Sequence, residues 1–395
     1  MDINQSNLAV RKLLAKYSHT DPDDWFLTFR ARLGMAVCFE AIYDIYGSGE
    51  VITQPYTCIT AINPIIAGNL KPIYADIDPA TLSINQPENV YSSKTHAIVL
   101  QHTLGIIGDK SQEIAAFAKK HRLILIEDSA HCLARMATDK SGSPLADISV
   151  HSFGVEKVLQ NTKFGGAIYV NPALKKKNRQ LYDKITSHLL DLPQPPRGLN
   201  MRARTYRAQN SIIQHLPSSM RHGVRDFARK IHFFEPAIMP YEQDAEQSRA
   251  YASTKFINTT ILQHLPALPS IYKRRLTNTR TYHKKLATDQ TITLMTNVDE
   301  PLLTYPILFP DAATATKMYD ILTSSGFFIR RWYSPLLYPG PNSNRRYDYN
   351  PKMAPIAESI HARVLCLPTD LTPEKMKRII AILHPIDKPV EKIIK

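Results

Sequence analysis

Residues 123–170 decide the fold of this chain, through the runs LILIED (123–128), DISVHSF (147–153) and GGAIYV (165–170). Apolar runs of this length, bounded by polar residues and glycines, predict buried strands at 123–126, 148–153 and 167–170. Strands that are apolar throughout are typical of a sheet covered by helices on both faces. The stretch therefore predicts the core of an α/β domain.

Two charged residues follow these predicted strands. Asp128 closes the first run, and Lys157 comes four residues after Phe153. Open α/β sheets bind their ligands at the carboxyl ends of the strands. A lysine amine can form a Schiff base with an aldehyde, and a carboxylate beside a pyridinium nitrogen keeps that ring protonated as an electron sink. The pair therefore indicates a site for pyridoxal phosphate.

Simpler interpretations of these residues stay open at this point. Taken alone, Asp128 is more often a helix cap or a surface salt-bridge partner, and Lys163 is a rival to Lys157. The pair Gly165-Gly166 could make a tight turn before the next strand. Only the register of a longer pattern selects among these interpretations.

The order of the other elements predicts two domains. A strand at 97–101 and an amphipathic helix at 112–121 extend the alternation of strands and helices. After residue 265 the pattern changes to a helix up to 287, strands at 303–309 and 326–332, and a helix at 373–383. We expect a large domain over 1–250, with a basic insertion at about 171–245, and a smaller C-terminal α+β domain over 251–395.

A series of short motifs, in a fixed order, matches a known family. They are GEVI and PYT (49–57), KPIYADID (71–78), His102 with Gly105 and Asp109, IEDSAH (126–131), Ser152-Phe153 to Lys157 with Gly165-Gly166-Ala167, and ARVLCLP (362–368). In this order and spacing the chain resembles the DegT/DnrJ/EryC1/StrS family of pyridoxal-phosphate sugar aminotransferases. The resemblance implies the type I fold of such enzymes, with a mostly parallel sheet wrapped by helices.

The resemblance also implies roles for individual residues. Lys157 would form the Schiff base with pyridoxal 5'-phosphate and move the proton, and Asp128 would hold the pyridinium nitrogen. His131 would lie near the phenolic oxygen of the cofactor, and Ser152 would bind its phosphate. The segment LGMAV (33–37), with Gly34, Met35 and Ala36, occupies the position of the phosphate loop of the family. No metal site is expected.

Several positions differ from the family pattern. Met35 replaces the usual hydroxyl residue of the phosphate loop, and Cys58 stands where an aromatic residue normally stacks on the cofactor ring. Ala250 takes the place of an Asn that reaches the phosphate of the neighbouring subunit, and Leu337 falls where a His is frequent. These differences predict weaker cofactor binding, or help from other groups.

A basic segment separates the two predicted domains. Residues 171–232 hold 13 Lys or Arg against three Asp or Glu, a net +10 of the +14 of the chain. Three hypotheses compete for this segment: contact with anionic lipid at the inner membrane surface, attraction of a nucleotide diphosphate, and contact with an acidic partner. A solvated helix pair at a dimer interface is a fourth. Few aromatic residues and no known binding motif argue against nucleic acid.

The resemblance implies an aminotransferase that moves an amino group, with glutamate as the expected donor, onto a nucleotide-linked keto sugar in the biosynthesis of cell-surface polysaccharides or secondary metabolites. The resemblance implies a homodimer. One alternative is a non-enzymatic paralogue acting as a scaffold or regulator. Another is a sugar dehydratase of the same family, although such enzymes carry His in place of Lys157. Four unpaired cysteines and the lack of a signal peptide predict a cytoplasmic protein.

Overall fold

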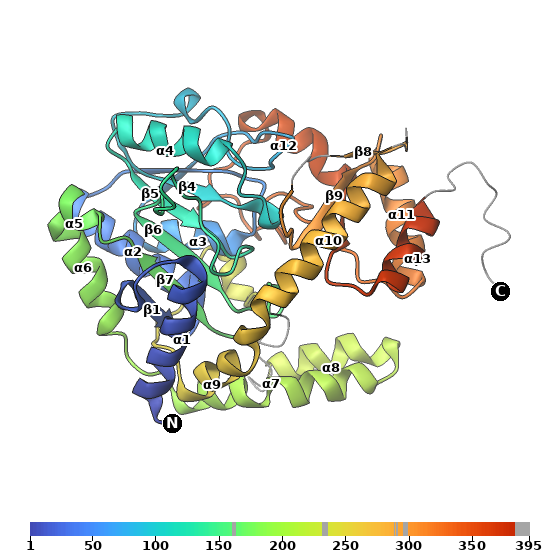
Figure 1. Cartoon of the computed structure of the whole chain (residues 1–395), viewed down its shortest axis with the longest axis horizontal. Coiled ribbons are helices and arrows are strands. Elements are labelled where there is room, and N and C mark those ends of the chain that lie inside the picture. Colours follow the sequence, from blue (N-terminus) through green and yellow to red (C-terminus); the bar gives the residue numbers. More distant parts are fainter. Residues whose placement is uncertain (160–162, 231–235, 288, 290, 295–298, 384–395) are drawn as a thin grey trace.

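The fold is an α/β unit joined to a smaller unit that contains its own sheet (Figure 1). The computed structural model describes residues 1–159, 163–230, 236–287, 289, 291–294 and 299–383. The strands are β1 Trp25–Thr28, β2 Glu50–Thr53, β3 Lys71–Tyr74, β4 Thr95–Gln101, β5 Ile124–Asp128, β6 Ile148–Ser152, β7 Gly166–Val170, β8 Thr293–Leu294, β9 Thr304–Leu308 and β10 Val364–Pro368.

The large sheet has the strand order β1-β7-β6-β5-β4-β2-β3. Pairs β2 with β3, β2 with β4, β4 with β5 and β5 with β6 are parallel, and only β7 runs antiparallel to its neighbours. The predicted fold class, a mostly parallel sheet with a smaller α+β domain, is therefore confirmed. The strand β5 continues to Asp128, two residues beyond the predicted end, so that its last two residues are held in the sheet.

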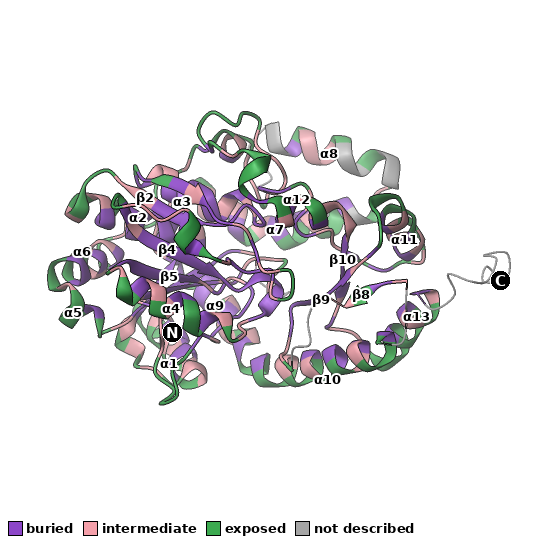
Figure 2. Ribbon diagram, turned by 90° about the horizontal axis from the view of Figure 1, so that it is seen from above, coloured by how far each residue is buried: buried purple, intermediate pink, exposed green. Residues whose placement is uncertain are grey.

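Helices cover both faces of the large sheet, and the buried residues lie between these layers (Figure 2). Side chains of α2 and α6 pack on one face with Ile124 and Ile126, whereas Leu125 packs on the opposite face with α4. The helices are α1 Ile3–Ser18, α2 Ala31–Tyr46, α3 Ile59–Ala67, α4 Lys110–Lys120, α5 Leu174–Lys177, α6 Arg179–Leu190, α7 Arg197–His215, α8 Ser218–Lys230, α9 Lys255–His264, α10 Leu268–Leu286, α11 Ala312–Ser324, α12 Pro355–Ile360 and α13 Pro373–Leu383.

The smaller unit is built around the antiparallel sheet β10-β9-β8. Its core joins these strands to α10, α11 and α13. The predicted helix at 373–383 is confirmed, but the predicted strand at 326–332 is wrong. Of this segment only Arg330 makes a bridge, to Cys366. The chain leaves the sheet there because Trp332 and the following tyrosine turn toward the large unit. The predicted domain boundary at residues 250 and 251 stays a prediction.

The basic insertion contains the helices α7 and α8. They lie side by side as a hairpin that projects from the large unit (Figures 1 and 2). No helix in the described part of the chain is long and apolar enough to cross a membrane.

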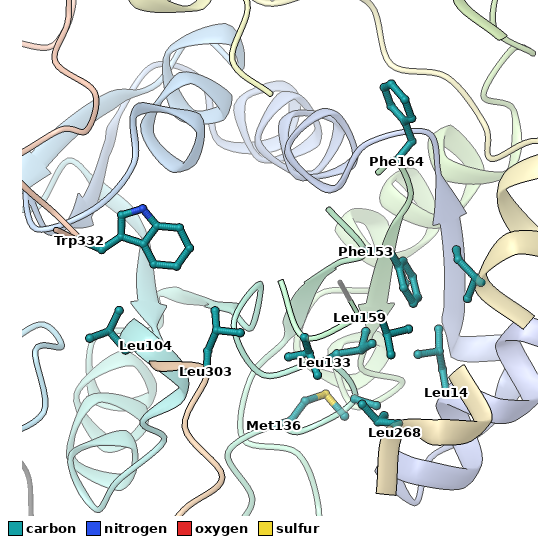
Figure 3. Close-up of a cluster of buried hydrophobic side chains, with 14 of the residues drawn as sticks. Leu14, Leu104, Leu133, Met136, Phe153, Leu159, Phe164, Leu268, Leu303 and Trp332 are labelled. Atoms are coloured by element: carbon teal, nitrogen blue, oxygen red, sulfur yellow. The ribbon is translucent and has the colours of Figure 1, made fainter. Parts of the chain in front are cut away.

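One network of buried polar groups holds the centre of the large sheet. Glu127 of β5 is fully buried, and its carboxylate accepts from His102 Nε2 at 2.5 Å, from Ser149 Oγ at 2.6 Å and from the N–H of Ala137 at 2.6 Å. Burial opposes the charge, but the charge of His102 and these hydrogen bonds hold the pKa of Glu127 below its ordinary value. Apolar side chains, including Leu133, Phe153 and Leu159, form a buried cluster of their own (Figure 3).

Replacing Glu127 with Ala should destabilise the protein by about 3 kcal/mol, because it leaves the buried donors of three elements without an acceptor. Ser149→Ala, which removes one hydrogen bond, should cost about 1 kcal/mol. Urea unfolding followed by circular dichroism measures both changes. Equal stabilities of the two variants would contradict this role of Glu127.

Candidate active site

A cavity of about 650 Å³ lies at the carboxyl ends of β5 and β6. Side chains from five separate parts of the chain line it. They come from the start of α2, from the start of α3, from the segments after β5 and β6, from the α7–α8 hairpin with the segment that follows it, and from residues 328–338. A cavity of this size at this edge of a parallel sheet is where ligands of α/β proteins bind.

Asp128 faces the cavity from the last position of β5. Since successive residues of a strand point to opposite faces, Asp128 points away from the Glu127 network and toward the face covered by α2. Its Oδ1 accepts a hydrogen bond from the N–H of Ala130 at 3.0 Å, and its other oxygen accepts none from any described residue. Burial raises the pKa of Asp128, and the positive charge of Lys157 opposes this shift. The other carboxylate oxygen of Asp128 can therefore accept a hydrogen bond from a protonated nitrogen.

Lys157 faces the same cavity from the segment after β6. Its Nζ lies 5.6 Å from the ring centroid of Trp332 and accepts or donates no hydrogen bond within the described residues. Removal from water lowers the pKa of Lys157, although the charge of Asp128 acts in the opposite direction. A lowered pKa gives a larger share of neutral amine, which is the nucleophilic form. The structure therefore brings Lys157 and Asp128 together, as the sequence predicts.

The rival Lys163 also lines this cavity, but its position differs. Its Nζ lies 3.6 Å from the ring centroid of Tyr206 in α7. The charges that act on the pKa of Asp128 include that of Lys157, together with those of His102 and Glu127. Geometry and charge thus favour Lys157 as the partner of the carboxylate.

The glycine pair after Lys163 does more than make a turn. Gly165 has a φ of +110°, and a Cβ on Gly166 would lie 2.3 Å from Cα and N of Ala31. Only glycines allow β7 to approach the first residue of α2 so closely. The approach places the start of α2 beside Ser152, the strand partner of Gly166, which also lines the cavity.

The phosphate loop expected at residues 33–37 is part of a helix. The helix α2 begins at Ala31, two residues before the predicted segment, and the N–H of Gly34 already donates to the Arg30 carbonyl. Met35 lines the cavity. Gly34 lies against Ile168, and the side chain of Ala36 is buried away from the cavity lining. The groups at the cavity end of α2 are thus Arg30, Ala31 and Arg32, which the motif did not indicate.

His131 is buried and packs in a layer of aromatic rings. Its ring is stacked on Trp332 with centroids 5.2 Å apart and an angle of 9° between the planes. The N–H of Leu104 donates to Nδ1 at 3.1 Å, so the proton lies on Nε2, 3.3 Å from the hydroxyl of Tyr333. Burial, with the charges of Lys157 and Arg330, lowers the pKa of His131 well below its ordinary value. His131 is therefore a neutral, oriented side chain.

Trp332, Tyr333 and Tyr338 are site residues that sequence reasoning missed. The aromatic-rich run RRWYSPLLYP (330–339) was the available signal, but it was interpreted as the end of a strand. Cys58 faces the cavity, and its backbone forms a β-bridge with Tyr338. Its Sγ accepts a hydrogen bond from Thr60 Oγ1 at 3.0 Å. The aromatic surface absent at Cys58 is thus supplied by another segment of the chain.

The family profile for DegT/DnrJ/EryC1/StrS aminotransferases matches residues 33–189 and 254–384 of this chain. Among the curated relatives, a pleiotropic regulatory protein of Geobacillus stearothermophilus is 36% identical over 31% of this chain and 33% of its own. A dTDP-4-amino-4,6-dideoxy-D-glucose transaminase of Shigella dysenteriae is 35% identical over 38% of this chain and 41% of its own. These alignments thus span less than half of either relative.

Longer matches exist at lower identity. The dTDP-4-amino-4,6-dideoxy-D-glucose transaminase of Escherichia coli is 23% identical over 85% of this chain and 79% of its own. The crystal structure of the aminotransferase TlmJ from Streptoalloteichus hindustanus superposes with a TM-score of 0.67 at 19% identity, over 96% of this chain and 89% of that one. NtdA from Bacillus subtilis with bound cofactor PMP gives a TM-score of 0.68 at 19% identity, over 95% and 76%. These two structures support the fold.

Incubation with pyridoxal phosphate, reduction with borohydride and peptide mapping should place the label on Lys157. Burial favours its neutral amine, and Asp128 lies in the same cavity. Lys157→Ala should lose the label, and Lys163→Ala, the matched control from the same cavity, should keep it. A label on Lys163 in the wild-type protein would contradict the assignment.

Proposed function

Because the chain belongs to the DegT/DnrJ/EryC1/StrS aminotransferase family, whose enzymes use pyridoxal phosphate, we propose that it transfers an amino group from an amino acid to a nucleotide-linked keto sugar. Glutamate is the proposed amino donor. The observation that carries the proposal is the placement of the Lys157 amine and the Asp128 carboxylate in one cavity at the carboxyl ends of β5 and β6. The substrate class follows from the dTDP-sugar transaminases among the relatives.

The residues of the cavity fit this cofactor. The oxygen of Asp128 without a hydrogen-bond donor can bind a protonated ring nitrogen, and His131 with Trp332 offers a flat, apolar surface for a ring. At the start of α2 the guanidinium groups of Arg30 and Arg32 can attract a phosphate, helped by the helix dipole. These arginines can compensate for Met35, which has no hydroxyl.

Each residue then has a defined task. When bound, the cofactor supplies an electron sink next to the substrate carbon. Lys157 Nζ, whose pKa is lowered by burial, can in its neutral form take a proton from that carbon and return it to a neighbouring position. Asp128 stays charged where a cation is near, and so keeps the ring nitrogen protonated. The aromatic layer around Trp332 excludes water from the region where the proton moves.

The two alternatives are less well supported. A dehydratase of this family would carry His at position 157, and the amine of Lys157 argues against it. The scaffold hypothesis rests on the changes at Met35 and Cys58, but arginines and aromatic rings from other segments replace what those changes remove. A protein without catalysis would have no need to keep an amine in a cavity that lowers its pKa.

The purified protein should show a visible absorption band with pyridoxal phosphate that bleaches on addition of glutamate, and Lys157→Ala should show neither change. A band that glutamate leaves intact would keep the cofactor but refute glutamate as the donor. No band in the wild-type protein would refute the proposed function and favour the scaffold hypothesis. Product analysis after addition of a dTDP-keto sugar distinguishes amination from dehydration.

A homodimer is also part of the proposal. Its support is the family, together with the exposed apolar side chains Ile212 of α7, Phe227 of α8 and Phe328 near the cavity, which a subunit interface would cover. Sedimentation velocity at the concentration used in assays should give twice the mass of one chain, 44.7 kDa. A single species with the mass of the monomer would refute this part.

A further inference from the structure

The α7–α8 hairpin lies between the two segments matched by the family profile, residues 33–189 and 254–384, and is part of neither. Nevertheless it forms one wall of the cavity, through Tyr206, Asn210, Arg225 and Asp226. The cofactor is common to the whole family, so its contacts are expected in the matched segments. A wall outside these segments is more suited to the ligand that differs between members, which is the second substrate.

Arg225 of α8 is oriented by the other helix of the hairpin. Its Nη2 donates to Asn210 Oδ1 of α7 at 3.2 Å. Its Nε is buried and has no hydrogen-bond acceptor among the described residues. A buried guanidinium N–H without an acceptor is unfavourable, and an oxyanion in the cavity would supply one. Nη2 thus holds the side chain of Arg225 in place, and Nε is available to donate to a ligand.

The surroundings of Arg225 are positively charged and aromatic. Lys163 lies with its Nζ over the ring of Tyr206, and the charge of Arg225 acts on the hydroxyl of that tyrosine. The cations that line the cavity are Arg30, Arg32, Lys157, Lys163 and Arg225, and the carboxylates are Asp128, Glu156 and Asp226. Lys157 lies near Asp128. Arg32 forms an ion pair with Glu242, which does not line the cavity. At the hairpin wall Lys163 and Arg225 lie beside Tyr206, and Asp226 is the carboxylate of the same wall.

The segment that follows the hairpin, with Ala237 and Glu242, is fixed to the start of α2. Arg32 pairs with Glu242, Nε to Oε1 at 2.5 Å and Nη2 to Oε2 at 2.9 Å. The carbonyl of Ala237 accepts from Arg32 Nη2 at 3.0 Å and from Arg30 Nη1 at 3.4 Å. Glu242 is buried, so this pair is shielded from solvent. These contacts hold the segment after the hairpin, which also lines the cavity through Pro236, Ala237 and Ile238, against the start of α2 before any ligand binds, and such preorganisation favours affinity.

We propose that Tyr206, Asn210 and Arg225 of the hairpin, together with Lys163, form a phosphate-binding subsite that takes the diphosphate of a nucleotide-linked substrate. This inference rests on the proposed function and names the residues that would recognise its substrate. The phosphate of the cofactor is the other source of the same chemistry, and the experiment separates the two. Binding of the hairpin to anionic lipid is a different hypothesis, and it becomes an outcome of the test.

The test compares Arg225→Met with Arg207→Met, which removes the same charge from an exposed position of the same hairpin. Isothermal titration calorimetry measures the affinity of each protein for dTDP and UDP, and the absorption spectrum measures the affinity for pyridoxal phosphate. Arg225→Met should weaken the binding of the nucleoside diphosphates roughly tenfold or more, because it removes a charge-assisted contact. Arg207→Met should bind them as the wild-type protein does. Arg225→Lys, which keeps the charge but not the planar fork, should lie between.

Each outcome has one meaning. Weaker binding of nucleoside diphosphates in Arg225→Met, with unchanged circular dichroism, supports the subsite with substrate as its ligand. Weaker binding of pyridoxal phosphate alone overturns the assignment to the substrate and gives Arg225 to the cofactor. Equal affinities of the wild-type protein and the three variants overturn the subsite. Weaker flotation of both Met variants with anionic vesicles would then assign the hairpin to lipid. If glutamate still bleaches the wild-type spectrum, such failures leave the proposed function intact.

Discussion

Two neighbouring carboxylates at the end of β5 impose the constraint on which the site depends. Glu127 and Asp128 are adjacent in the chain, but the alternation of a strand points them to opposite faces of the sheet. Glu127 is surrounded by donors from His102, Ser149 and Ala137, which hold its pKa low and join three elements. Within the described part of the chain Asp128 receives one donor, the N–H of Ala130, and burial raises its pKa. One carboxylate stabilises the sheet, and its neighbour stays available for a ligand.

The cavity exists because remote segments meet at this edge of the sheet. The close approach of Gly166 to Ala31 brings the start of α2 to the end of β6, and no larger residue could occupy that position without a shift. From the smaller unit, Trp332 stacks on His131 and lies near Lys157. The same removal from water that makes an unpaired lysine unfavourable also lowers its pKa and makes its amine reactive. Packing and chemistry at Lys157 thus have one cause.

The hairpin illustrates how an insertion can act on a site that it does not build. The sheet, the lysine and the aspartate belong to the segments that match the family, 33–189 and 254–384. The added helices carry much of the net charge of the chain and close one side of the same cavity. In sequence this segment is only a basic, amphipathic tract, compatible with lipid, a nucleotide or a protein partner. Only the folded structure places Tyr206, Asn210 and Arg225 of this segment at the cavity.

The sequence by itself determined the class of fold, the central strands and the helix at 373–383, because apolar periodicity is a local property that survives folding. The motif register also determined which lysine and which aspartate to consider. It did not determine the start of α2, and the strand it predicted at 326–332 is replaced by a single bridge at Arg330, where tertiary contacts override local preference. Only the tertiary structure decided that Trp332, Tyr333 and Arg225 line the cavity that holds Lys157, because the contacts that place them join residues far apart in the chain.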